Sequence, residues 1–88
     1  MDHEFPPHDR TAIINLAMKH PEVVAVHELR TRSSGILSFV QLHLEMDGTH
    51  TLFRAHQIAD EVEAEIIKHY PETDVIIHQD PAGLNESH

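Results

Sequence analysis

The stretch ILSFVQLHLEM, residues 36–46, alternates apolar and polar side chains, and this alternation limits the fold more than any other feature. Side chains two apart on a strand share a face, so Gln41, His43 and Glu45 lie together on one side. The other side carries an apolar set: Val40, Leu42, Leu44 and Met46. The pattern predicts a strand whose apolar face is covered by other elements.

A short helix is predicted before this strand. The stretch DRTAIINLAMKH begins at Asp9 and places Ile13, Leu16 and Ala17 on one stripe. Asp9 is the expected N-cap of this helix, and Pro21 stops it.

A longer helix is predicted after the strand, over residues 51–70, with Thr49 or Thr51 as its cap. Its glutamates fall largely off the apolar stripe, as expected for a helix with one face in water. The stripe consists of Leu52, Ala55, Ala59, Val62 and Ile66.

Two further strands complete the domain. The valine-rich stretch at residues 23–31 predicts the first strand, with a turn at 33–35, and DVIIHQDP at 74–81 predicts the last. The resulting order is α-β-β-α-β. It predicts an α+β sandwich in which two helices cover one face of a three-stranded mixed sheet, with the last strand parallel to the second.

Composition excludes several classes of function. The 88 residues include no cysteine, so disulfides and thiolate metal sites are excluded. The formal net charge is -9, which argues against nucleic acid and anionic lipid as partners. No phosphate-binding loop, His-Glu-x-x-His motif or nucleophile triad is present, and no stretch reaches the length of a membrane span. The ten histidines remain as the feature that calls for a function.

The hairpin loop decides whether His27 and His43 meet. Each lies eight residues from Gly35, so an odd-numbered loop centred there sets them opposite each other, with Cβ atoms about 5 Å apart. A two-residue turn at Ser34 and Gly35 would instead set His27 against Leu42. The alternation favours the first register, because that register keeps Leu42 with the apolar set.

Other candidate ligands come from the last strand and the long helix. His78 and Asp80 share a face at the end of the sheet, although the stagger that would bring them to His43 cannot be derived from spacing. His56 lies in the second turn of the long helix, with Asp60 one turn on, and nothing in the spacing requires it to join the others.

Four imidazoles and one carboxylate form a nitrogen-rich set that suits Zn²⁺. Fe²⁺, Co²⁺, Ni²⁺, Cu²⁺ and Cd²⁺ are the alternatives. Five ligands exceed one tetrahedron, so either one ligand stays idle or Asp80 bridges two ions. The plainer interpretation of each histidine taken alone is an ordinary, partly buried side chain.

The chain resembles a known family in four stretches, which together run from about Asp9 to Pro81. The stretches are AVHELRTRSSG, FVQLHLEM, AHQIADEVEAEI and YPETDVIIHQDP. They are similar to the cytoplasmic C-terminal domain of cation diffusion facilitator transporters of the zinc and iron efflux branch. The resemblance implies a metallochaperone-like (ferredoxin-like) fold and a homodimer beneath a membrane domain. It also implies that zinc bound at the dimer interface tightens the dimer and regulates transport.

The resemblance also implies a ligand set. Carried over by position, the family's binuclear site falls on His27, His43, His56, His78 and Asp80, with Asp80 as the bridge. Gln79 matches a position beside the metals. Glu28 stands where relatives often have Asp, and Ala82 stands where some have Cys, but neither change removes a ligand.

These observations predict three segments: a flexible lead-in at 1–8, the regulatory domain at 9–81 and a flexible tail at 82–88. The expected function is metal sensing and dimerisation in a divalent-cation efflux transporter, on the cytoplasmic face of the membrane, without enzymatic activity. One alternative is a stand-alone soluble metal carrier. The other is a small binuclear metallohydrolase, which would use the paired ions to activate water.

Overall fold

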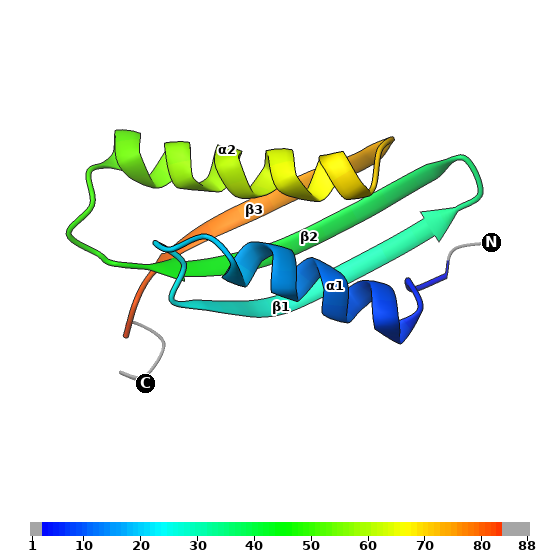
Figure 1. Ribbon diagram of the computed structural model, residues 1–88, viewed down its shortest axis with the longest axis horizontal. Coiled ribbons are helices and arrows are strands. Elements are labelled where there is room, and N and C mark those ends of the chain that lie inside the picture. Colours follow the sequence, from blue (N-terminus) through cyan, green and yellow to red (C-terminus); the bar gives the residue numbers. More distant parts are fainter. Residues whose placement is uncertain (1–2, 84–88) are drawn as a thin grey trace.

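The computed structural model describes residues 3–83 and confirms the predicted element order. Two helices lie on the same side of a three-stranded sheet (Figure 1), and His3, the first described residue, pairs with Ser33 near the β1–β2 hairpin. The strand order is β1-β2-β3, with β1 antiparallel and β3 parallel to β2. The elements are α1 (Pro7–Met18), β1 (Ala25–Ser34), β2 (Leu37–Met46), α2 (Leu52–His69) and β3 (Thr73–Pro81).

The alternation in β2 has the predicted effect. The four apolar residues from Val40 to Met46 are all buried in the core beneath the helices. Helix α1 buries the predicted stripe of Ile13, Leu16 and Ala17. The face of the sheet that carries Gln41, His43 and Glu45 is not covered by either helix, and we call it the open face.

The start of α1 differs from the prediction. The helix begins at Pro7, where the fixed φ of proline suits the first helical position, so Asp9 is not its N-cap. Asp9 instead accepts a hydrogen bond of 2.9 Å from the Tyr70 hydroxyl. Burial, together with this hydrogen bond, raises the pKa of the Tyr70 phenol. Phe5, within the predicted lead-in, packs in the core.

The flexible lead-in at 1–8 and the flexible tail at 82–88 stay predictions. His3 pairs with Ser33 of β1 through two backbone hydrogen bonds of 2.9 and 2.7 Å. Residues 1–2 and 84–88 lie outside the described residues. Within residues 3–83, no helix has both the length and the hydropathy needed to cross a membrane.

Helix α2 confirms one predicted cap and corrects one predicted core position. The Thr51 side chain accepts a hydrogen bond of 3.0 Å from the Arg54 backbone N–H, as an N-cap residue does. Leu52 was placed on the buried stripe, but it is 83% exposed, and its neighbour Phe53 is 78% exposed. Ile58, which the predicted stripe did not include, is fully buried in the core. The first turn of α2 therefore presents apolar surface to solvent.

The hairpin reaches the predicted pairing by a different route. Its loop has two residues, Gly35 and Ile36, since Ser34 pairs with Leu37, so the odd-numbered loop is wrong. A two-residue hairpin turn requires positive φ, and Gly35, with φ 83°, adopts it readily. Continued without a break, this register would place Glu28 opposite His43.

A β-bulge in β1 shifts this register by one residue. Glu28 and Leu29 together oppose the single residue Leu42, after which His27 pairs with His43. Glu28 has φ 52°, in the left-handed region that asparagine and aspartate tolerate better than glutamate does. Arg10 of α1 donates a hydrogen bond of 3.1 Å to the Leu29 carbonyl, which gives the bulge a partner from the helix layer.

Replacing Glu28 by glycine is expected to stabilise the domain by about 0.5 kcal/mol, because glycine adopts positive φ without steric cost. Urea unfolding measures the change. Glu63→Gly, in the middle of α2, is the matched control and should lower stability by about 1 kcal/mol. A loss of stability in both variants would contradict the left-handed conformation of Glu28.

Candidate metal centre

Three histidines form a row across the open face. His27 of β1 pairs with His43 of β2, and His43 pairs with His78 of β3, so each strand contributes one imidazole. The row arises because β2 is the central strand, and both of its neighbours are in register at His43. The predicted pairing of His27 with His43 is confirmed, and the stagger that the sequence left open brings His78 beside them.

The next row contains carboxylates. Glu45 of β2 pairs with Ala25 on one side and with Asp80 on the other. Like charges directly opposite each other on neighbouring strands destabilise a sheet. Two carboxylates placed together beside three imidazoles are therefore a favourable setting for a cation, whose charge would offset their repulsion.

His43 is the most connected of these side chains. Its Nδ1 lies 2.9 Å from Oδ2 of Asp80, and its ring stacks on that of His78 with centroids 4.5 Å apart. Nε2 of His78 lies 3.2 Å from the side-chain nitrogen of Gln41. His43 and Asp80 are both partly buried, so their mutual orientation is held by the surrounding sheet.

His27 has a partner that the sequence argument missed. Its Nε2 hydrogen-bonds Oε2 of Glu45, whose side chain is 13% exposed. The only sequence signal for this contact was the alternation of β2, which placed Glu45 on the same face as His43. It was insufficient because the diagonal contact from β1 depends on the register that the bulge sets.

His56 does not join the row. It lies on α2, in the layer that covers the other face of the sheet, and its side chain is 70% exposed. Its Nε2 lies 3.3 Å from Oδ2 of Asp60, one helical turn away. Four of the five predicted ligands are therefore together on the open face, while His56 points to solvent elsewhere.

The donors suit a metal ion in kind but are not gathered around one point. In the described part of this single chain, no three or more histidine, aspartate or glutamate side chains converge closely enough to hold an ion. They form pairs instead, His27 with Glu45 and His43 with Asp80. A cation at this face would need small side-chain movements, a donor from another chain, or both.

Another histidine forms a contact that spacing did not predict. His20 follows the end of α1. Its Nδ1 accepts a hydrogen bond of 3.0 Å from the Glu22 N–H, and its Nε2 donates one of 2.6 Å to Glu61 of α2. This hydrogen bond lowers the pKa of the Glu61 carboxyl. His20 therefore ties the end of α1 to α2, away from the open face.

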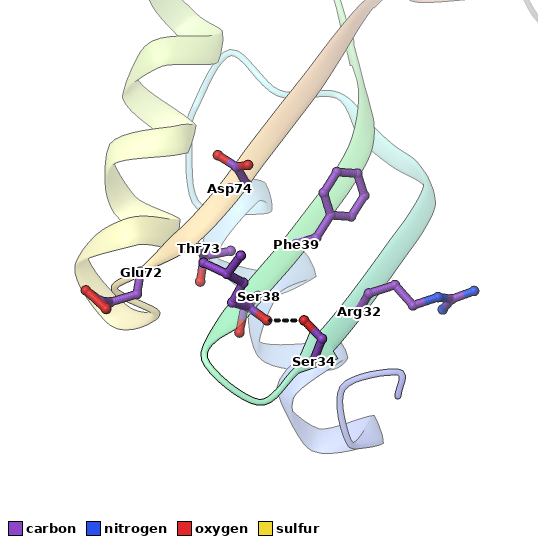
Figure 2. Close-up of a pocket in the computed structure, with 8 residues that line it drawn as sticks. Arg32, Ser34, Ser38, Phe39, Glu72, Thr73 and Asp74 are labelled. Carbon is purple, nitrogen blue, oxygen red and sulfur yellow. Dashed lines mark hydrogen bonds between the residues drawn. The ribbon is translucent and has the colours of Figure 1, made fainter. Parts of the chain in front are cut away.

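A hollow lies at the hairpin end of the sheet. Figure 2 shows Arg32, Phe39 and Asp74 on three neighbouring strands, and these residues are partners in the sheet register. The hollow has no histidine in its lining, so it is separate from the candidate metal centre. Its lining consists of Arg32, Ser34, Leu37, Ser38, Phe39, Glu72, Thr73 and Asp74.

Comparisons with known proteins identify the family to which the chain is similar. The family described as "Cation efflux protein, cytoplasmic domain" matches residues 5–82. "Protein p34" of Rickettsia rickettsii is 46% identical over 86 residues, which cover 98% of this chain and 29% of that protein. "Cation-efflux pump FieF" of Escherichia coli is 44% identical over 84 residues, covering 96% of this chain and 28% of that protein. The chain thus spans less than a third of these relatives.

Solved structures support the fold. A structure of CzrB in its Zn form superposes with a TM-score of 0.84 at 30% identity, covering 96% of this chain and 97% of that one. The MamM CTD has a TM-score of 0.78 at 21% identity, covering 84% of this chain and 94% of the other. At that identity the MamM likeness concerns the fold alone.

Proposed function

Because the chain belongs to the family of cation efflux protein cytoplasmic domains, we propose that it senses divalent metal and dimerises as the regulatory domain of an efflux transporter. The observation that carries the proposal is the row of His27, His43 and His78 on the open face. The carboxylates of Asp80 and Glu45 lie in the adjacent row. A purely structural sheet gains nothing from this placement, because it sets two negative charges side by side.

Zinc is the metal that these donors fit best. Imidazole nitrogens with a carboxylate oxygen are common zinc ligands, and the chain has no thiolate to compete with them. In the proposal, His27, His43, His78 and Asp80 hold the ion, which supplies positive charge between the strands. The solved Zn form of CzrB supports this choice. Fe²⁺ and other divalent ions remain the alternatives.

A second copy of the chain supplies His56. Because His56 is exposed on the helix layer, it reaches an open face only when another copy presents it. The exposed apolar residues Leu52 and Phe53 lie in the turn before it and provide the contact area around it. A two-fold arrangement repeats the exchange, so each open face receives one histidine from the other copy.

Metal binding then controls the distance between the two copies. With fifteen acidic and six basic residues, the chains repel each other, and ions bound between them offset part of this repulsion. If an open and a closed dimer interconvert, zinc favours the closed form by its higher affinity for that form. Cargo transport itself belongs to the part of the transporter outside this chain. The domain lies on the cytoplasmic side and is not an enzyme.

Titration of the chain with zinc tests the proposal. Calorimetry should detect at least one ion per chain, and small-angle scattering should show a dimer whose radius of gyration falls as zinc is added. Magnesium is the control, because it requires octahedral oxygen ligands and should produce neither effect. Zinc binding without dimerisation or compaction would favour the soluble carrier, and an absence of zinc binding would refute metal sensing.

A further inference from the structure

Glu45 is the least explained charged group on the open face. It lies next to the end of β2, and its side chain is largely buried although it carries a carboxylate. Among the ion pairs of residues 3–83, none joins it to a lysine or arginine; its partner is His27. A carboxylate that is shielded from water and has only an imidazole as its partner calls for an explanation.

The contact between Glu45 and His27 has a defined chemical consequence. An ionised carboxylate can only accept hydrogen bonds, so the proton shared with it lies on Nε2 of His27. In a neutral imidazole, this leaves the lone pair on Nδ1. The hydrogen bond therefore selects one of the two tautomers, and it also fixes the orientation of a ring that is otherwise rather exposed.

We propose that Glu45 is a positioning residue that holds His27 in the Nε2–H tautomer, with Nδ1 as the nitrogen that binds the metal. This inference rests on the proposed metal-sensing function. It adds a residue outside the predicted ligand set and assigns the ligating atom of His27. Carboxylates that accept a hydrogen bond from the second ring nitrogen of a histidine ligand orient the ring and make it a stronger ligand.

A competing explanation is that Glu45 acts through its charge alone. Asp80 lies opposite it in the register of β2 and β3, so removing Glu45 also changes the field at another proposed ligand. The two explanations differ in one respect. Positioning requires His27 to be present, whereas a general charge effect or direct ligation by Glu45 does not.

Two variants separate hydrogen bonding from charge. Glu45→Gln removes the charge but keeps an oxygen that can accept from Nε2, while Glu45→Leu removes both. In the metal-free chain, long-range ¹H–¹⁵N NMR should find His27 as the Nε2–H tautomer in the wild type and in Glu45→Gln. The tautomers should be mixed in Glu45→Leu. Glu65→Leu, an exposed change on α2, is the control and should leave His27 unaltered.

Zinc affinity provides the second measurement. Glu45→Leu should weaken binding by about 10- to 100-fold, while Glu45→Gln should recover most of the loss. In a His27→Ala background, Glu45→Leu should have no further effect beyond about twofold. An equal loss in both backgrounds would overturn the proposal, as would an unchanged tautomer in Glu45→Leu. If the wild type binds no zinc, the proposed function fails, and the tautomer comparison alone decides whether Glu45 positions His27.

Discussion

The double replacement of His78 and Asp80 by alanine is expected to abolish zinc-driven compaction and to weaken zinc binding by more than about a hundredfold. The change removes the third imidazole of the row together with the carboxylate that lies 2.9 Å from His43. The imidazoles of His27 and His43 remain, and even with His56 from the second copy they fall short of the four ligands of a tetrahedral zinc site.

Calorimetry and small-angle scattering on the same samples check this expectation. His8→Ala, at an exposed position of α1, is the control and should behave as the wild type. His56→Ala should retain binding to a single chain but lose most of the compaction, because the second copy then has no histidine to contribute. A double variant that still contracts with zinc would show that the ion binds elsewhere.

Truncating the core beneath the site should have the largest effect on stability. Leu42 is fully buried at the centre of β2 and immediately precedes His43, the middle histidine of the row. Leu42→Ala is expected to lower the free energy of unfolding by about 3 to 5 kcal/mol, the range for buried leucines that leave a cavity. For a domain of 88 residues, this is a large part of the total stability.

Urea unfolding with and without zinc connects this stability to metal binding. Zinc at about 100 times its dissociation constant should restore about 2.7 kcal/mol, because only the folded chain brings the ligands together. Leu37→Ala is the matched control: the residue type and the strand are the same, but Leu37 is 69% exposed, and its loss should cost less than about 0.5 kcal/mol. Comparable losses in the two variants would contradict the assigned register of β2.

Most of the fold could be predicted because it depends on local periodicity. The alternation from Val40 to Met46 fixed which face of β2 is buried, and the stripe of Ile13, Leu16 and Ala17 fixed the buried face of α1. The ends of the helices were less predictable. Pro7 begins α1 before Asp9 because the fixed φ of proline suits the first helical position. The exposure of Leu52 depends on which segments pack against the first turn of α2.

The pairing of His27 with His43 was predicted correctly from an incorrect loop. The loop has two residues, and the bulge at Glu28 and Leu29 supplies the one-residue shift that brings His27 opposite His43. Spacing alone cannot distinguish these arrangements, because a bulge and an odd-numbered loop shift the register by the same single residue. The contact of Arg10 with the Leu29 carbonyl, which supports the bulge, comes from a helix nineteen residues earlier.

By itself, the sequence determined the element order, the buried faces and which side chains share the open face, since these follow from the periods of helix and strand. The tertiary structure decided the remaining questions: the row at His27, His43 and His78, the contact of Glu45 with His27, and the separation of His56 from the others. Each of these depends on how one element is placed against another. That placement is set by packing and register across the whole sheet, which no local pattern encodes.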